Sequence, residues 1–255
     1  MNIIIPMAGE GRRFKEAGYA NLKPFIEINH KPMIRWVLEN INLYGDNYKY
    51  IFICNIGYCQ KLDEILSNYF YHYPNSYKII PIHNITEGAA CTVLLSELYI
   101  DNEEELLIVN SDQLVLEKHN IIAKEEWCYS GLNHFRKMNA DGGIFCFWND
   151  NPKWSYCRIS NGKINQTIEK EVVSNFATTG SGYWFKRGKD FVSAAKRMIN
   201  KNDRSKGEFY VVPAYNYLIS DDKVIIPYFI NNLVGLGTPE DLEIFCKKEG
   251  FKVIK

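Results

Sequence analysis

Short apolar runs alternate with helical patterns through the first part of this 255-residue chain, and this alternation constrains the fold most strongly. The apolar runs predict strands at Ile3–Ile5, Lys49–Ile56, Tyr77–Ile82 and Glu105–Val109. The stretches between them predict helices at Lys31–Leu43, Gln60–Phe70 and Cys91–Tyr99. Strands that alternate with helices in this way build a parallel sheet with helices on both faces. We therefore expect an α/β fold.

The second half of the chain is richer in strand patterns. These predict strands at Gly142–Trp148, Tyr156–Ser160, Lys163–Ile168, Gly180–Phe185, Lys223–Ile230 and Leu233–Leu236. Asn161-Gly162 is expected to close a hairpin, and helices are expected at Lys189–Ile199, Glu208–Leu218 and from Thr238 onward. With no internal repeat and no low-complexity linker, residues 1–255 are predicted to form one globular unit.

The first strand leads into a loop, Gly9-Glu10-Gly11-Arg12-Arg13, that suits an anion. Glycines let backbone N–H groups approach phosphate oxygens closely, and arginine adds permanent charge in a planar fork. The loop lacks the Gly-Lys pair of a P-loop, and Phe14 stands where a dinucleotide fingerprint needs a third glycine. The alternative is a glycine-rich surface turn with two solvated arginines.

Further candidate residues follow the other predicted strands. Asp112 lies just past the end of a buried strand, where open α/β sheets bind ligands, and its carboxylate suits Mg²⁺. Gly88 and the alanines after it begin a helix, so that a flat base or ribose can lie against the backbone. Lys23, held by Pro24, is a candidate to reach back towards the first loop. The alternatives are a turn aspartate, tight helix packing and a solvated lysine.

Composition excludes several classes of function. Lys+Arg and Asp+Glu are 30 each, so the overall charge does not favour nucleic acid or an acidic membrane surface as a partner. No apolar run approaches the roughly 20 residues of a membrane helix, and no signal-peptide pattern is present. The seven cysteines form no C-x-x-C pair, which is typical of reduced thiols. We therefore expect a cytoplasmic protein.

Taken in order, these motifs resemble the nucleotidyltransferase family that activates sugar phosphates and related phosphomonoesters. The resemblance rests on the Gly-x-Gly-x-Arg loop, the Lys-Pro pair, the small-residue turn at Gly88, and Asp112. It continues with Glu169-Lys170, with Gly207-Glu208-Phe209-Tyr210 and with Gly237-Thr238-Pro239-Glu240, and so covers nearly the whole chain. The opening IIIPMAGEGRRF is most similar to a capsule-associated subgroup that includes CTP:phosphoglutamine cytidylyltransferase.

The resemblance implies a Rossmann-like, mostly parallel mixed sheet flanked by helices, with a nucleotide-binding half (about 1–140) and a β-rich acceptor-binding half (about 141–255). It implies transfer of a nucleoside monophosphate, CMP favoured, from a triphosphate to a phosphoglutamine-type or sugar-phosphate acceptor, with Mg²⁺ as cofactor and a role in capsule or surface polysaccharide synthesis. The residues it implies are catalytic Arg13, Lys23 and Lys170; nucleotide-binding Ala8, Gly9, Glu10, Gly11, Arg12, Glu87, Gly88 and Ala89; acceptor-binding Glu169, Thr179, Gly180 and Glu208; and metal-binding Asp112.

The chain also departs from the family pattern. Gly235 stands where many relatives carry a second metal aspartate, and Glu171 replaces the proline usual after the Glu-Lys pair. Two other functions stay open at this stage: a metal-dependent glycosyltransferase that uses a nucleotide sugar, and a non-catalytic nucleotide-binding regulatory domain. The base, the acceptor and the oligomeric state are left open by the sequence.

Overall fold

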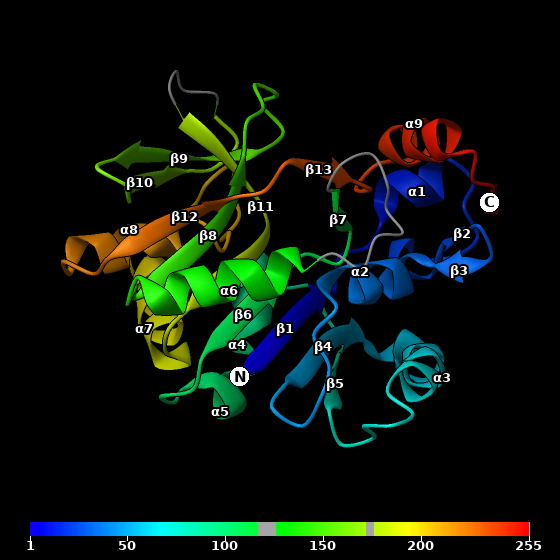
Figure 1. Ribbon diagram of the computed structural model, residues 1–255. Helices are drawn as coiled ribbons and strands as arrows, with labels where there is room; N and C mark the ends of the chain where they lie inside the picture. Colours follow the sequence, from blue (N-terminus) through cyan, green and yellow to red (C-terminus); the bar gives the residue numbers. More distant parts are fainter. Residues whose placement is uncertain (117–125, 172–175, 255) are drawn as a thin grey trace.

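The computed structural model describes residues 1–116, 126–171 and 176–254, which build an α/β architecture around one large mixed sheet (Figure 1). The strands are β1 Asn2–Met7, β2 Glu27–Ile28, β3 Lys31–Pro32, β4 Lys49–Asn55, β5 Tyr77–Ile82, β6 Leu106–Val109, β7 Gln113–Leu116, β8 Gly142–Phe147, β9 Ser155–Ser160, β10 Lys163–Ile168, β11 Phe176–Phe185, β12 Ile225–Phe229, β13 Asn232–Gly235 and β14 Val253–Ile254. The α-helices are α1 Arg12–Glu16, α2 Met33–Ile41, α3 Cys59–Tyr69, α4 Ala89–Leu94, α5 Glu97–Ile100, α6 Trp127–Lys137, α7 Gly188–Asn200, α8 Ala214–Ser220 and α9 Pro239–Glu249, with short 3-10 turns η1 Lys23–Phe25 and η2 Ile56–Tyr58.

The large sheet has a parallel centre. Its strand order is β10-β9-β11-β6-β1-β4-β5, and β8 lies off this path, pairing with β11 and β12. The pairs β6–β1, β1–β4, β4–β5 and β8–β12 are parallel, whereas β11 runs antiparallel to β6, β8 and β9. The predicted α/β fold, with its mostly parallel mixed sheet flanked by helices, is therefore confirmed.

Strand β1 shows why helices must cover both faces of the sheet. Its side chains alternate between two apolar clusters, with Ile3 and Ile5 in one and Ile4 in the other. The first cluster also takes buried residues from α2, α3, α6 and α9, and the second from α4, α5, α7 and α8. Because successive strand residues point to opposite faces, an unbroken apolar run is stable only when both faces are covered.

None of the helices in the described ranges combines the length and the apolar character that spanning a bilayer requires.

Strand β11 joins the two halves of the molecule. Its first part pairs with β9 and its last part, Gly182–Phe185, pairs with β6; the register shifts between Thr179 and Tyr183. Ser181, in the shifted stretch, has a φ of 70°. A bulge of this kind re-aims a strand. The sheet therefore continues from its parallel strands through β11 into the β9–β10 hairpin without a break.

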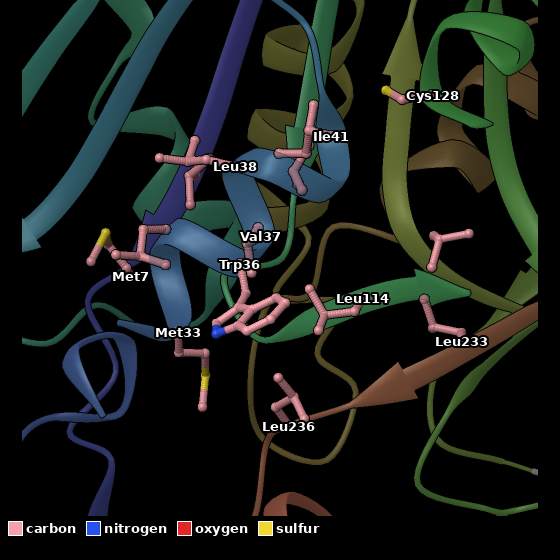
Figure 2. Close-up of a cluster of buried hydrophobic side chains, with 14 of the residues drawn as sticks. Met7, Met33, Trp36, Val37, Leu38, Ile41, Leu114, Cys128, Leu233 and Leu236 are labelled. Carbon is pink, nitrogen blue, oxygen red and sulfur yellow. The ribbon is translucent and has the colours of Figure 1, made fainter. Parts of the chain in front are cut away.

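The small β7–β13 sheet packs on α2. Figure 2 shows Trp36 of α2 beside Leu114 of β7, with Leu236 below them. The side chain of Asn40 accepts from the N–H of Val115 at 2.9 Å and donates to its C=O at 2.8 Å, both in a buried setting. Asn40 thereby supplies the two hydrogen bonds that a third strand would give to β7.

Local turn chemistry was predicted well. The β9–β10 hairpin closes through Asn161 and Gly162, both at positive φ, and the Thr238 side chain caps α9 by accepting from the Asp241 N–H at 3.1 Å. Pro239 takes the first helical position. These predictions are confirmed. Each of them depends only on residues that are neighbours in the sequence.

Several predicted helix boundaries were wrong. Helix α2 begins at Met33, because Lys31–Pro32 pairs with β2 through a turn at two positive-φ residues, and Pro32 takes the N-cap position. The predicted helix Cys91–Tyr99 is two short helices separated at Leu95 and Ser96. The predicted helix Glu208–Leu218 starts only at Ala214, because the backbone of Phe209 is hydrogen-bonded to Glu87 and Ala90 instead. Helix α6 and strand β7 had no counterpart among the predicted elements.

Replacing Asn40 tests how the small sheet is held. Asn40→Ala leaves the N–H and C=O of Val115 buried without partners, and each such group costs about 1–3 kcal/mol. We expect the free energy of unfolding in urea to fall by about 3 kcal/mol, whereas Asn68→Ala on the exposed face of α3 changes it by less than about 0.5 kcal/mol. Equal losses in the two variants would contradict the structural role of Asn40.

Candidate active site

A cleft of about 510 Å³ opens where β1 and β6 end, and residues from both halves of the chain line it. From the first half, the lining side chains and backbone belong to Pro6, Ala8, Gly9, Arg13, Lys23, Ile85, Thr86, Gly88, Ala89, Thr92, Asn110, Ser111, Asp112 and Gln113. From the second half they belong to Lys153, Trp154, Ser155, Glu169, Lys170, Thr179, Tyr183, Glu208, Tyr210, Val211, Val212, Gly235, Gly237, Thr238 and Asp241. This cleft brings together most of the site residues predicted from the sequence.

The glycine-rich loop follows β1 directly. Gly11 has a φ of 62° and is the N-cap of the short helix α1, a left-handed conformation that favours glycine. Gly9 and Arg13 line the cleft. Arg12 instead points along α1, where its Nε donates to Glu16 Oε1 at 2.7 Å on the surface, and neither Arg12 nor Glu10 is part of the cleft wall.

Lys23 and Asp112 form an ion pair inside the cleft. Lys23 begins the 3-10 turn η1, and its Nζ donates to Asp112 Oδ2 at 2.8 Å. Asp112 is held just after β6 through its own C=O, which accepts from the Leu236 N–H at 2.7 Å. Lys23 thus lines the same cleft as the first loop, and its direct partner is the aspartate that the sequence assigned to metal.

The turn at Gly88 is fixed by close backbone packing. Gly88 has a φ of 142°, and a Cβ at this position would lie 2.4 Å from the C=O oxygen of Phe209. The Phe209 N–H donates to the Glu87 C=O, and the Ala90 N–H donates to the Phe209 C=O, both at 2.9 Å. Only glycine fits this approach. Gly88 and Ala89 line the cleft, whereas the side chain of Glu87 pairs with Arg204 outside it.

Glu169 is a buried carboxylate in the second half of the chain. Its side chain accepts from Ser155 Oγ at 2.6 Å. Burial raises the pKa of the Glu169 carboxyl above its ordinary value, and Glu208 adds to the rise, while the Ser155 hydrogen bond and the Lys170 ammonium oppose it. Lys170, at a φ of 50°, places its Nζ 4.1 Å from the centre of the Tyr210 ring.

Strand β11 supplies the remaining predicted acceptor residues. Thr179 is buried and lines the cleft, whereas Gly180 is not part of the cleft wall. Gly180 faces β13 instead, where a Cβ on it would lie 2.3 Å from the Leu233 side chain. Tyr183, on the same strand, also faces the cleft, and burial raises the pKa of its phenol. Gly180 therefore lets β11 approach β13 closely.

No site role was predicted for Tyr210, Trp154 or Lys153, all of which line the cleft. Tyr210 lies in the Gly-Glu-x-Tyr segment, which was the available signal. A Cβ on Gly235 would lie 3.0 Å from Trp154 Cη2, so the indole fills the space beside this residue. Lys153 pairs with Asp241 at 2.7 Å.

The donor set in the cleft suits a cation that arrives with other ligands. The described residues contain no group of three or more His, Cys, Asp or Glu side chains placed to hold a metal ion. Asp112 and Asp241 both line the cleft, and each is paired with a lysine, Asp112 with Lys23 and Asp241 with Lys153. Mg²⁺ is commonly bound by one or two carboxylates together with substrate phosphates and water, and Asp112 fits that role.

Comparisons with known proteins bear on the fold. No family model matches the chain, and no curated protein matches it in sequence. Among solved structures, the nucleoside-diphosphate-sugar pyrophosphorylase from Vibrio cholerae RC9 is 23% identical, with a TM-score of 0.77 over 96% of this chain and 99% of that chain. A UDP-glucose pyrophosphorylase complexed with UDP-glucose is 16% identical, with a TM-score of 0.71 over 97% and 98%. The inositol-1-phosphate CTP transferase from T. maritima is 13% identical, with a TM-score of 0.69 over 97% and 94%. The chain shares their fold.

The environment of Glu169 makes stability depend on pH. Because the folded pKa is raised above the ordinary value of 4.5, the unfolded chain releases this proton more readily, and the stability of the wild type falls as pH rises through the interval between the two values. We expect the free energy of unfolding of Glu169→Gln minus that of the wild type to increase between about pH 4 and pH 8, because only the wild type loses stability over this range. Urea unfolding across this range measures the trend. Glu64→Gln, at an exposed position on α3, serves as the control, and the same trend in both variants would contradict the assignment.

Proposed function

We propose that this chain is a nucleotidyltransferase, which transfers a nucleoside monophosphate from a triphosphate to a small phosphomonoester and releases pyrophosphate. The observation that carries this proposal is the arrangement of charge in the cleft. Arg13, Lys23 and Asp112 come from the first half of the chain, and Lys170 comes from the second. Arg13 and Lys170 make no ion pair among the described residues, so both cations are available to anions.

The fold supports this choice. One similar structure is described as a nucleoside-diphosphate-sugar pyrophosphorylase, another as an inositol-1-phosphate CTP transferase and a third as a UDP-glucose pyrophosphorylase. A glycosyltransferase that uses a nucleotide sugar has no triphosphate tail to bind, and so has no need of the glycine-rich loop with Arg13. A non-catalytic domain would have no need of Lys170 on the acceptor side.

In this mechanism, residues 1–140 hold the nucleotide. The backbone N–H groups of Gly9 and Gly11, together with Arg13, bind the β- and γ-phosphates, and Ala8 lies beside them in the cleft. The base lies against Gly88 and Ala89 beside Glu87. Lys23 neutralises the α-phosphate. Because charge accumulates on the phosphoryl oxygens, fixed cations supply most of the rate.

Residues 141–255 hold the acceptor. Lys170 binds its phosphate, while Glu169, Glu208 and Thr179 form the pocket around the rest of the molecule. An acceptor phosphate oxygen forms a new bond to the α-phosphorus as the bond to the β-phosphate oxygen breaks, and pyrophosphate leaves. A phosphate dianion is already a nucleophile at neutral pH, so the chain needs no general base.

Asp112 is the residue that would hold Mg²⁺. When bound, this ion stabilises negative charge on the phosphoryl oxygens. Lys23, now paired with Asp112, lies close enough to pass to the α-phosphate when the nucleotide enters. Lys23 would then face the α-phosphate and Asp112 would face Mg²⁺, so that each side chain keeps an opposite charge beside it.

CTP is the triphosphate we favour, with a phosphoglutamine-type or sugar-phosphate acceptor and a cytoplasmic role in capsule or surface polysaccharide synthesis. Support for the choice of CTP comes from the motif resemblance and from the inositol-1-phosphate CTP transferase among the similar structures. The decisive experiment incubates the protein with Mg²⁺, each of the four triphosphates and a panel of phosphomonoesters, and detects pyrophosphate. Release with CTP and a phosphomonoester supports the proposal. No acceptor-dependent release with any triphosphate would overturn it.

Arg13 and Arg12 form a matched pair of variants. Arg13→Ala removes a cation from the cleft, and we expect turnover to fall about 100- to 1,000-fold, as when a charge stabiliser is lost at a reacting phosphoryl group. Arg12→Ala removes a surface ion pair with Glu16, and we expect activity within about threefold of wild type. Both melting temperatures should stay close to wild type. Equal activity losses would assign Arg12 to the nucleotide after all.

Asp112 is tested through metal dependence. Asp112→Asn keeps the shape of the side chain and removes its charge, so we expect the Mg²⁺ concentration for half-maximal activity to rise by at least about tenfold. Asp46→Asn, on an exposed loop, is the control. A crystal of the triphosphate complex that shows a second protein carboxylate on the ion would contradict the assignment of Asp112 as the one carboxylate ligand.

A further inference from the structure

The three lysines that line the cleft have different partners. Lys23 pairs with Asp112 at 2.8 Å, and Lys153 pairs with Asp241 at 2.7 Å. Lys170 has no carboxylate within 4 Å of its ammonium in the described part of the chain. Its Nζ lies instead 4.1 Å from the centre of the Tyr210 ring and donates to the Tyr210 hydroxyl. Lys170 is therefore held by a neutral side chain.

The neighbouring carboxylate is kept away from this ammonium. Glu169 precedes Lys170 in the chain, but it is buried and accepts from Ser155 at 2.6 Å. Lys170 itself adopts a φ of 50°, a left-handed conformation that is uncommon for lysine. The two adjacent side chains thus take separate partners, one carboxylate with a hydroxyl and one ammonium with an aromatic ring.

The backbone next to Tyr210 is held in place by hydrogen bonds. The residue before it, Phe209, is buried and makes two backbone hydrogen bonds of 2.9 Å with Glu87 and Ala90 on the nucleotide turn. The Arg204 guanidinium lies 4.1 Å from the centre of the Phe209 ring, on its face. Tyr210 is therefore tied by its neighbour to the turn that we assign to the base.

We infer that Tyr210 is a positioning residue, which holds the Lys170 ammonium in the acceptor pocket without neutralising it. A ring face attracts a cation only weakly compared with a full opposite charge, so the ammonium is placed but still available to a phosphate. A carboxylate partner would compete with the phosphate for the same charge. This inference rests on the proposed function, because the phosphate belongs to the proposed acceptor.

Two replacements of Tyr210 separate the ring from the hydroxyl. Tyr210→Leu removes both, and we expect the KM for the acceptor to rise about tenfold, within the range that loss of a cation–π contact gives. Tyr210→Phe keeps the ring and should recover most of this loss. We expect kcat, and the affinity for a non-hydrolysable triphosphate measured by calorimetry, to stay within about threefold of wild type. Tyr71→Leu, at an exposed tyrosine, is the matched control.

The contact itself is measured without any reaction. Reductive methylation with ¹³C-formaldehyde keeps the charge on lysine, and Lys170→Arg identifies the Lys170 resonance by its disappearance. Because the ammonium lies 4.1 Å from the centre of the Tyr210 ring, we expect the ring current to displace this resonance from those of the exposed methylated lysines in the wild type and in Tyr210→Phe. The shift should be lost in Tyr210→Leu and kept in Tyr71→Leu.

These measurements distinguish the inference from the proposed function. An unshifted Lys170 resonance in the wild type would overturn the inference, as would an unchanged acceptor KM in Tyr210→Leu, while nucleotidyl transfer would still stand. A fall in kcat and melting temperature together, with no change in KM, would likewise overturn it in favour of a structural role. If no acceptor gives pyrophosphate, the proposed function fails, and the resonance decides separately whether Tyr210 holds Lys170.

Discussion

The parallel pairing of β1 with β4 and β6 is the constraint on which the site depends. In this register Ile4 lies opposite Ile108 and Met7 opposite Cys54, so the three strands end along one edge of the sheet. The glycine-rich loop and the segment that carries Asp112 therefore leave the sheet side by side. Because β1 is buried on both faces, a slip in register would move its side chains to the wrong apolar cluster. Burial in the core thus fixes the geometry of an exposed cleft.

A second constraint joins the acceptor half to this edge. Strand β11 pairs with β9 in its first part and with β6 in its last, and the Gln113 side chain accepts from the Ser181 N–H at 2.6 Å where the register shifts. On the other side, the backbone of Phe209 is bonded to the turn at Gly88. The wall that carries Lys170 and Tyr210 is therefore attached to the wall that carries Gly88 and Asp112 through hydrogen bonds that involve the main chain.

The sequence predicts those parts of the molecule that neighbouring residues decide. Apolar runs predicted the central strands, Asn161-Gly162 predicted its hairpin, and Thr238 predicted a helix start. The helix expected from Glu208 begins only at Ala214, because the peptide of Phe209 finds partners more than a hundred residues away, and helix propensity carries no information about them. Tyr210 and Asn40 escaped prediction for the same reason, since their roles arise only from the residues that folding brings against them.

In the cleft, motif spacing identified Arg13, Lys23, Asp112, Glu169 and Lys170, whose side chains line it together, but it could not separate Arg12 from Arg13, which diverge within one turn of helix.

The surroundings of Gly235 show how packing limits the charge in the cleft. The Trp154 indole packs edge-on against Phe147, with ring centres 5.3 Å apart, and so is fixed where a side chain at residue 235 would have to lie. Gly237 is similarly close to Asp112, since a Cβ there would lie 3.1 Å from Oδ2. The β13–α9 connection therefore approaches the cleft as bare backbone at both positions. A side chain at residue 235 would require the Trp154 indole to shift by a few tenths of an ångström, against its packing on Phe147. Asp112 faces Lys23 in the cleft, and under the proposed function the charges that balance a triphosphate would come from Arg13, from Lys23 and from what the nucleotide itself brings.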